Sequence, residues 1–467
     1  MSAVEIQPRT VGPLAALSTD SHVSVLLGAG ASVAAGLPDW NTFAIELLVN
    51  SGAIKDRATA GAFLEGQDPA IAAEAAKQAA GADWPNLLRS TLYGDTPVDP
   101  APLHAAAAAL AAARDPSSIS LFTLNYDDLL EESLRGILDQ PSDPKVFSRW
   151  DLRPRASPSE HEVHHLHGLL PRAPSTAEAV VLTLGDYHRL GQKQAAWQVS
   201  ALQEAIQKGP LILAGTSYRD PDIRQWIHDL ISEDDDAKVL VFLAREGMKL
   251  GREQFELVRG ALEMQWSALG VQVVATHDHA DAAQALRELP YINGAGYAAP
   301  SQRAAHLWQV HVDQFTMFQE GDSDELEQDL LILQEQLPDF GNLTLWVADS
   351  NGSLVRWAAN DRVYRSPNHL RRVLTGHDSY WIAGQCLGRN DTLIKDVEGP
   401  ASTARWRSVV AVPVVVDLCG GPPLPCAVIS GASTKTRSDA PLDELSTVFA
   451  ELSEKWSSLL KLRHDGL

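Results

Sequence analysis

The stretch that decides the fold is Val23–Leu27, of sequence VSVLL, which runs directly into residues 28–32, of sequence GAGAS. The first stretch is short, mostly apolar and begins with a β-branched residue, as buried strands do. A buried strand that ends in a glycine-rich turn before a helix is typical of a parallel α/β sheet. We therefore expect a strand over 23–27 and a helix after the turn.

Six more apolar runs follow along the chain, and helical patterns lie between them. The predicted strands span 119–124, 162–166, 180–184, 210–214, 238–244 and 271–276. The predicted helices span 101–113, 126–138, 192–207 and 221–232. Strands that alternate with helices in this way indicate an α/β fold with a doubly wound, mostly parallel, Rossmann-like sheet.

The character of the chain changes after residues 291–301, a stretch rich in Gly, Ala and Pro. Residues 304–337 have a helical pattern with an acidic break at 320–324. Two predicted hairpins and a closing helix follow, with strands at 343–348, 353–358, 406–416 and 426–433 and the helix at 440–460. We therefore expect a large α/β domain over 1–295, a helical linker over 296–325 and a smaller antiparallel α+β domain over 326–467.

The charge of the chain bears on its partners. Of its 467 residues, 38 are Lys or Arg and 60 are Asp or Glu, which gives a formal net charge of −22. Non-specific binding to nucleic acid or to an anionic membrane needs clustered Lys and Arg, so this composition argues against both. It does not exclude a small anionic ligand, because local backbone dipoles can override the global field.

The three cysteines, Cys386, Cys419 and Cys426, lie in the last quarter of the chain and form no C-x-x-C pair. This set encodes neither a zinc site built on cysteine pairs nor a disulfide framework, so we expect no metal. Residues 1–19 lack the basic head and apolar core of a signal peptide, and no long apolar run could span a membrane. We expect a cytoplasmic protein.

The turn at Gly28, Ala29, Gly30 and Ser32 suits a phosphate group. Glycines let the backbone approach a ligand closely, and the following helix directs free N–H groups and the positive end of its dipole to the same place. The dinucleotide fingerprint is only half met, because Val33 stands where its third glycine belongs. A tight turn without a ligand is the alternative.

Further polar clusters lie along this part of the chain, and most of them follow predicted strands. They are Pro38, Asp39 and Trp40; Asn125 and Asp127; His167; Gly215, Thr216 and Ser217; and Asp220. The carboxyl ends of parallel strands share one edge of a sheet, where ligands collect, so we expect these groups to converge on one crevice. Helix capping alone is the alternative for Asn125, Asp127 and Asp220.

In this order and spacing the motifs resemble the sirtuin family, and more closely the bacterial SIR2-like NAD-cleaving proteins of antiphage defence. The resemblance covers residues 20–290 and rests on G-A-G-x-S, G-x-P-D, T-x-N-x-D, H-G and G-T-S. It implies an NAD site in which the phosphates bind at Gly28, Ala29, Gly30 and Ser32, Asn125 and Asp127 lie at the nicotinamide end, His167 is the catalytic base, and Gly215, Thr216 and Ser217 contact ribose and phosphate. Pro38, Asp39, Trp40 and Asp220 would complete this site.

Several departures separate the chain from deacylating sirtuins. Asn41 replaces the usual arginine, and no cysteine lies between His167 and Gly215, where the zinc module would sit. That module helps to shape the cleft for an acyl-lysine peptide, so its absence argues against deacylation. The resemblance then implies an NAD⁺ glycohydrolase without zinc that yields nicotinamide and ADP-ribose, as a regulated effector of antiphage defence by NAD depletion. The alternatives are an NAD- or ADP-ribose-sensing module without turnover, and a zinc-less deacylase or ADP-ribosyl transferase.

The chemistry of this cleavage agrees with the residue types. Nicotinamide leaves as a neutral group from a sugar carbon that gains oxocarbenium character, so no strong acid is required. Asn125 and Asp127 suit the orientation of carboxamide and water, and an imidazole such as His167 suits a base near neutral pH. A metal pair of His165 and His167 is an alternative. We expect structural or solvated roles for His161, His164 and His165.

Residues 325–465 are similar to a GAF domain, a small-molecule sensing fold, in the strand-turn-strand around Gly352 and in the strand that contains Pro413. No ligand set is identifiable, and the tryptophans either line a pocket or pack a core: Trp346, Trp357, Trp381 and Trp406. We expect this domain to keep the enzyme quiet until an activating ligand or protein partner binds. The helical segment 304–337 would support a homo-oligomer.

Overall fold

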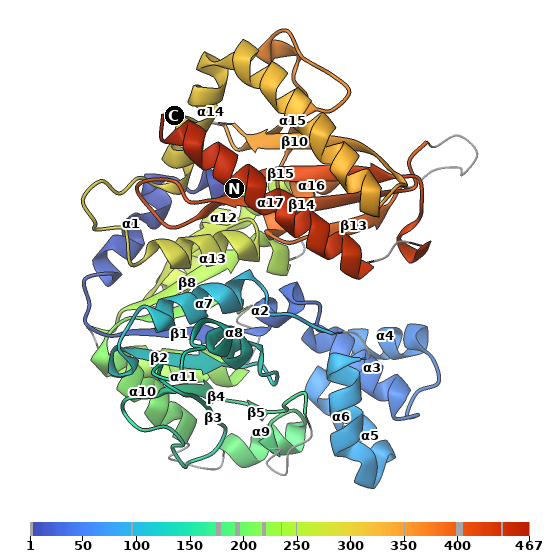
Figure 1. The fold of residues 1–467 in the computed structure, drawn as a ribbon. Coiled ribbons are helices and arrows are strands. Elements are labelled where there is room, and N and C mark those ends of the chain that lie inside the picture. The colour runs from blue at the N-terminus through green and yellow to red at the C-terminus, as the bar shows by residue number, and fades with distance from the viewer. Residues whose placement is uncertain are drawn as a thin grey trace. The chain divides into compact units, whose positions relative to one another are not determined.

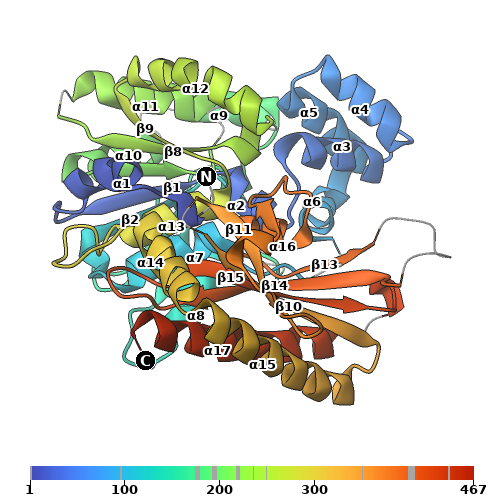
Figure 2. The ribbon, with the colours of Figure 1, turned by 90° about the horizontal axis from the view of Figure 1, so that it is seen from above.

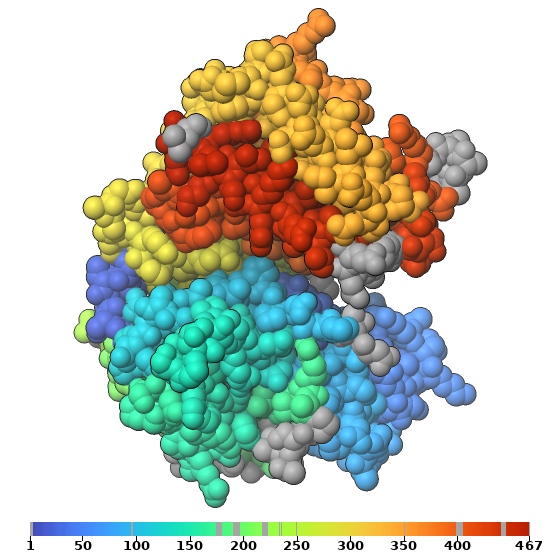
Figure 3. Space-filling model, in the orientation of Figure 1, coloured from blue at the N-terminus to red at the C-terminus, as the bar shows by residue number. Residues whose placement is uncertain are grey.

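The computed structural model describes residues 3–94, 97–173, 179–191, 197–216, 221–234, 236–248, 250–349, 351–397, 405–439 and 442–466, drawn in colour in Figure 3. The chain divides into two compact units, and each is described by itself (Figure 1). The N-terminal unit holds residues 19–248 and 253–275. The C-terminal unit holds residues from 276 onward together with 249–252 and the segment before residue 19.

A seven-stranded sheet forms the centre of the N-terminal unit, in the order β3-β4-β2-β1-β7-β8-β9. Its strands are β1 (Val23–Leu27), β2 (Ile119–Thr123), β3 (Val146–Arg149), β4 (His161–His165), β7 (Leu211–Ala214), β8 (Val239–Ala244) and β9 (Val271–Thr276). The pairings from β3 through β8 are parallel, and the central strand β1 is buried at every position. The predicted α/β fold with a mostly parallel sheet is confirmed.

Helices cover both faces of this sheet. Helices α7 (Pro102–Ala112) and α10 (Trp197–Lys208) both contact β1, and they lie on opposite sides of the sheet in Figures 1 and 2. The remaining helices beside the sheet are α2 (Ala29–Ala34), α8 (Leu129–Ile137), α9 (Leu184–Gly191), α11 (Pro221–Glu233) and α12 (Arg252–Ser267). The sheet is therefore doubly wound, as predicted.

Four helices between α2 and α7 form a layer that we did not predict. They are α3 (Trp40–Asn50), α4 (Arg57–Glu65), α5 (Pro69–Ala80) and α6 (Trp84–Tyr93), and they share an apolar core. The side chains of Asp39, Asp56 and Asp68 accept backbone hydrogen bonds at the starts of α3, α4 and α5, at 2.8, 2.9 and 2.8 Å. These caps begin each helix where the chain turns.

The predicted strand over 180–184 is wrong for most of its length. Only Ala179–Val180 is a strand, β6, and it pairs with β5 (Gly168–Leu169) in a separate two-stranded sheet. The Asp186 carboxylate accepts hydrogen bonds from the backbone N–H and the hydroxyl of Thr183, at 3.0 and 2.9 Å. This cap starts helix α9 where we expected the strand to continue.

A six-stranded antiparallel sheet forms the centre of the C-terminal unit, in the order β12-β11-β10-β15-β14-β13. Its strands are β10 (Phe340–Ala348), β11 (Ser353–Ala359), β12 (Arg372–Leu374), β13 (Leu393–Asp396), β14 (Ser408–Val416) and β15 (Leu424–Ser433). Both predicted hairpins form, since β10 pairs with β11 and β14 pairs with β15. The predicted antiparallel α+β architecture is confirmed.

The helices of this unit are α1 (Pro8–Leu17), α13 (His279–Glu288), α14 (Pro300–Asp313), α15 (Phe315–Gln336), α16 (Ile382–Arg389) and α17 (Leu442–His464). Helices α14, α15 and α17 contact the sheet and one another, and Leu307 and Trp308 of α14 are buried in its core. The segment predicted as a linker, 296–325, thus supplies α14 and half of α15 to this core.

The predicted acidic break at 320–324 is wrong, because α15 runs through it without interruption and the chain breaks at Gln314 instead. The reason is a buried polar contact. Asp322 is fully buried and accepts a hydrogen bond from the indole N–H of Trp357 at 2.7 Å and from the Arg463 guanidinium at 2.9 Å. A paired, hydrogen-bonded carboxylate is tolerated inside a helix that packs on a sheet.

Among the helices that the structure describes, none combines the length and the apolar character needed to cross a bilayer.

Candidate functional site

The glycine turn after β1 is held against the end of β7. Gly28 N donates to Ala214 O at 2.9 Å, and Gly30 N donates to Gly215 O at 2.7 Å. Ala31 N donates to Gly28 O at 3.0 Å. These three amides are therefore paired with protein carbonyls, contrary to our expectation that the turn directs free N–H groups at a ligand. Other groups near the turn must carry any phosphate contact.

Glycine is required on both sides of this contact. A Cβ on Gly28 would lie 2.8 Å from Gly215 O and 2.8 Å from Thr216 Cα, and a Cβ on Gly215 would lie 2.8 Å from Ala31 N. Gly215 also has a φ of +68°, a left-handed conformation that favours glycine. The structure thus brings the predicted residues Gly28, Gly215 and Thr216 together.

A hydrogen-bonded network of buried polar side chains lies beside the turn. Asn125 Nδ2 donates to Gly28 O at 3.0 Å and to Ser32 Oγ at 2.7 Å, and Ser32 Oγ donates to Asp127 Oδ2 at 2.7 Å. All three side chains belong to residues that are 7% exposed or less. Because both amide hydrogens of Asn125 donate, Oδ1 remains as an acceptor, and it has no hydrogen-bond partner among the described residues.

The end of β2 positions this hydrogen-bonded network. The Thr123 hydroxyl accepts a hydrogen bond from Asn125 N at 3.0 Å and donates to Leu27 O at 3.3 Å, which ties the β2 end to β1. Asp127 Oδ1 also accepts from Leu129 N at 3.3 Å, at the start of α8. Asp127 therefore has both a capping contact and a contact to Ser32, so the capping and site interpretations are compatible.

His167 follows β4, the strand that pairs in parallel with β2. Leu166 N donates to Thr123 O at 2.9 Å, so the chain leaves both strands at the same edge of the sheet. His167 is 2% exposed, and its ring centroid lies 5.6 Å from that of Tyr187 and 6.2 Å from that of Trp226. These rings form an apolar setting for the imidazole.

The other predicted residues have less specific surroundings. Asp39 caps α3 through Thr42 N, next to Pro38, and Trp40 packs against the core of the helical layer. Ser217 and Asp220 lie outside the described residues.

A buried ion pair behind the site was missed by sequence reasoning. His165 Nε2 lies 2.7 Å from Glu131 Oε1, and His165 Nδ1 lies 3.1 Å from Asn125 O. Glu131 also accepts a hydrogen bond from the Ser148 hydroxyl, on β3. A glutamate three residues before Leu134, on the buried face of α8, was the one signal that could have revealed the pair.

The two groups shift each other's pKa. Burial favours the neutral form of each, but the Glu131 carboxylate raises the pKa of His165, and His165 holds the pKa of Glu131 low. The raised pKa of His165 gives stability that is full below its ordinary value of 6.5 and is lost as pH rises through the raised value. The lowered pKa of Glu131 gives stability that is full above 4.5 and is lost as pH falls through the lowered value.

The pair therefore stabilises the fold most between pH 4.5 and 6.5. We expect Glu131→Gln to lower the free energy of unfolding by about 1.5 kcal/mol in this window and by less at alkaline pH. Urea unfolding at several pH values measures both. Glu132→Gln, at the exposed neighbouring position, is the control, and a cost of Glu131→Gln that grows toward alkaline pH would contradict the assignment.

The remaining histidines of the cluster are structural. Burial and the nearby Arg149 lower the pKa of His164 to about 3, and its ring lies 4.8 Å from that of Phe122. Both ring nitrogens of His165 are engaged as described. In the described part of the chain, no group of three metal-ligating side chains includes His165 or His167.

Comparison with known families adds to this geometry. Residues 119–273 match the family model described as a SIR2-like domain. This range contains Asn125, Asp127, His167 and Gly215, whereas the glycine turn precedes it. A SIR2-like domain indicates an NAD-related activity. No curated protein sequence matches the chain.

Several solved structures are similar to parts of the chain. A mutant Sir2 homologue in complex with ADP-ribose covers 60% of this chain and 96% of its own, at 14% identity and a TM-score of 0.32. A type II free methionine-R-sulfoxide reductase from Thermoplasma acidophilum covers 31% and 94%, at 18% identity and 0.23. A GAF domain covers 35% and 94%, at 19% identity and 0.20. At these TM-scores the fold described above rests on this chain's own strand order.

Proposed function

We propose, from the premise that the chain carries a SIR2-like domain over residues 119–273, that it is an enzyme that hydrolyses the nicotinamide–ribose bond of NAD⁺. The products are nicotinamide, ADP-ribose and a proton. The observation that carries the proposal is the buried hydrogen-bonded network from Gly28 O through Asn125 and Ser32 to Asp127. It lies at the same sheet edge as His167.

Asn125, Asp127 and His167 each have a role in the proposed reaction. As the C–N bond to nicotinamide breaks, the sugar carbon gains positive charge, and water attacks it. The Asn125 Oδ1 acceptor, held in one orientation by its two donated hydrogen bonds, suits an N–H of the carboxamide or an O–H of the water. The Asp127 carboxylate stabilises the developing positive charge, and His167 accepts the proton of the attacking water.

The absence of cysteines argues against deacylation, and the setting of His167 suits an electrostatic role. No cysteine lies between His167 and Gly215, so the zinc module of deacylating sirtuins is not encoded there. His167 is 2% exposed and lies beside the rings of buried Trp226 and half-buried Tyr187, which strengthens electrostatic contacts at its imidazole.

Incubation of the purified full-length protein with NAD⁺, with chromatography of the products, tests the proposal. We expect nicotinamide and ADP-ribose in equal amounts. Calorimetry that detects NAD⁺ binding without nicotinamide release, in the presence of candidate activators, would support a sensing module instead. Conversion of an acetyl-lysine peptide to the free lysine, with formation of nicotinamide and acetyl-ADP-ribose from NAD⁺, would support a deacylase.

We further propose that the protein is a regulated effector of antiphage defence, and that its C-terminal unit inhibits NAD⁺ hydrolysis until a ligand or partner binds. An unregulated NADase would deplete NAD in its own cell. Cells that carry the gene should lose NAD after phage infection, whereas cells that carry the His167→Ala variant should keep it. Equal NAD levels in both strains after infection would contradict this role. Light scattering of the purified protein tests the proposed homo-oligomer.

A further inference from the structure

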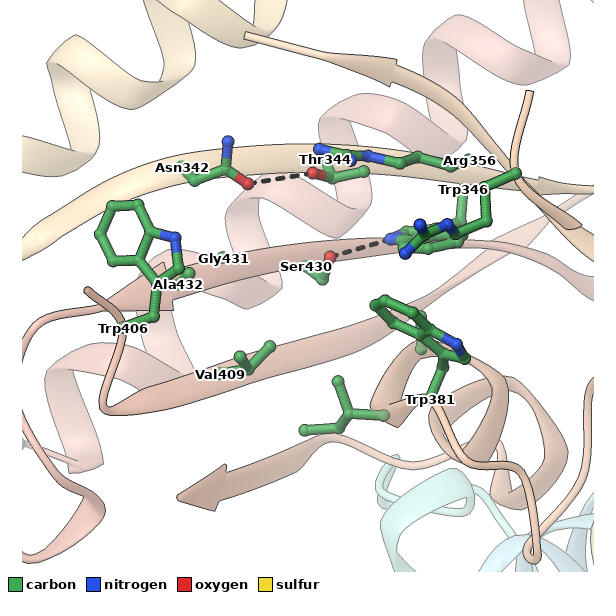
Figure 4. A pocket seen from close by; sticks show the side chains of 13 residues that line it. Asn342, Thr344, Trp346, Arg356, Trp381, Trp406, Val409, Ser430, Gly431 and Ala432 are labelled. Carbon is green, nitrogen blue, oxygen red and sulfur yellow. Dashed lines mark hydrogen bonds between the residues drawn. The ribbon is translucent and has the colours of Figure 1, made fainter. Parts of the chain in front are cut away.

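A cavity lies within the C-terminal unit, on the sheet face that α16 covers (Figure 4). Its volume is about 170 Å³. Side chains alternate across the strands, so Ser430 and Ala432 of β15 line the cavity while Gly431 between them would direct a Cβ at Phe449 of α17. The cavity is therefore on the face of the sheet opposite the core that α17 packs.

Three tryptophans form much of the wall: Trp346 on β10, Trp381 just before α16, and Trp406 just before β14. The rings of Trp346 and Trp381 lie 6.0 Å apart at 47°, at one end of the cavity, and Trp406 stands at the other end (Figure 4). Trp346 Nε1 donates to Ser430 Oγ at 2.9 Å, which holds its ring in place. Indole faces fixed in this way suit a planar ring.

Two arginines, Arg356 on β11 and Arg371 before β12, also line the cavity. The guanidinium carbon of Arg371 lies 4.9 Å from the centre of the Trp381 ring. The Nε of Arg356 is buried and has no hydrogen-bond partner, and none of the residues that line the cavity is an Asp or Glu. Among the described residues, neither arginine has an ion pair.

The absence of acidic residues from the cavity contrasts with the acidic composition of the whole chain. With 60 acidic residues against 38 basic ones, carboxylates are plentiful, yet none lies at this cavity. Arg356 is half-buried and Arg371 is exposed. Two guanidinium groups that stand beside indole rings without a carboxylate partner are suited to an anion that arrives from solution.

We propose that this cavity binds a small anion that carries one planar aromatic ring, with a carboxylate as the anionic group. The guanidinium forks hold the carboxylate in a bidentate manner, and the ring stacks on the indoles. The volume agrees with this size, since an apolar cavity of about 150 Å³ accommodates a benzene ring.

Ligand-observed NMR and calorimetry on the full-length protein test the proposal with three probes of one ring each: phenylacetate, 2-phenylethanol and 2-phenylethylamine. We expect saturable binding of phenylacetate in the millimolar range or tighter, and binding of the alcohol and the amine at least about tenfold weaker. Equal binding of the alcohol would show that charge does not select the ligand and would overturn the proposal. So would the absence of phenylacetate binding at about 10 mM.

Variants locate the binding. Arg356→Gln should weaken phenylacetate binding at least about tenfold, and Trp381→Ala should weaken binding of all three probes. Arg365→Gln, at an exposed position of the same unit that does not line the cavity, should change nothing. Unchanged affinity in Arg356→Gln would overturn the proposal.

The stability of Arg356→Gln gives a second readout that a purely structural arginine would not give. Arg356 is half-buried and has no ion pair among the described residues, so its replacement by glutamine should leave the free energy of unfolding nearly unchanged. A clear loss of stability would mean that Arg356 serves the fold and not a ligand. Neither readout depends on NAD turnover, so the outcome is separate from that of the proposed hydrolase.

Discussion

Replacement of His167 by alanine is expected to slow nicotinamide release from NAD⁺ by roughly 100- to 10,000-fold, the usual contribution of a general base. His167 is the buried imidazole at the sheet edge that also holds Asn125 and Asp127. Without it, no side chain is assigned to accept the proton of the attacking water. The measurement is kcat from product chromatography at saturating NAD⁺.

Two controls make this result specific. His228→Ala, at a side chain that is 59% exposed on α11, should leave kcat unchanged. His167→Gln keeps much of the side-chain volume against Tyr187 and Trp226, so it separates lost chemistry from lost packing. If both His167 variants melt like the natural protein and still turn over NAD⁺ at its rate, His167 is not the base.

Replacement of Gly28 by alanine is expected to lower the free energy of unfolding by about 3 kcal/mol and to abolish NAD⁺ binding. The new Cβ would lie 2.8 Å from two backbone atoms, Gly215 O and Thr216 Cα. Backbone atoms cannot move aside as the end of a flexible side chain can, so the ends of β1 and β7 must separate. Urea unfolding and calorimetry with NAD⁺ measure the two effects.

Gly36→Ala is the matched control for this change. Gly36 has a φ of +98° but nothing within 4 Å of its Cβ position, whereas Gly28 has a φ of −103° and no room. The control therefore tests backbone strain alone, at a cost of about 1 kcal/mol. If Gly28→Ala lowers the free energy of unfolding no more than Gly36→Ala does, the close approach of β1 and β7 does not require glycine at position 28.

Much of the central sheet could be predicted because its strands are buried on both faces. The runs that became β1, β2, β7, β8 and β9 are short and mostly apolar, whereas β4 (His161–His165) has Val163 as its one apolar residue. Each of the six was predicted to within two residues at either end. Edge strand β3 (Val146–Arg149) was missed because it is half-buried and partly polar, and thus gives no apolar run. The helices α3–α6 were missed because they lie together between α2 and α7, outside the alternation of strands and helices that the strand candidates indicate.

Part of the predicted grouping is seen in the structure, but the contacts within it were not predicted. The motifs placed Gly28, Ser32, Asn125 and Asp127 on one crevice, and they do meet. Motifs could not show that the Gly28 and Gly30 amides pair with the end of β7, because that contact joins residues more than 180 positions apart. The Glu131–His165 pair stayed hidden because it also joins residues from separate elements, 34 positions apart, which local patterns do not connect.

The amino-acid sequence by itself determined the alternation of strands and helices, the buried strand before the glycine turn, and the order of the polar motifs, since these depend on local periodicity and residue type. Only the tertiary structure decided which backbone amides of the turn are already hydrogen-bonded, which carboxylates form ion pairs inside the protein, and which arginines have no carboxylate partner. Those outcomes depend on what lies a few ångströms away in space, where burial sets the cost of leaving a polar group alone.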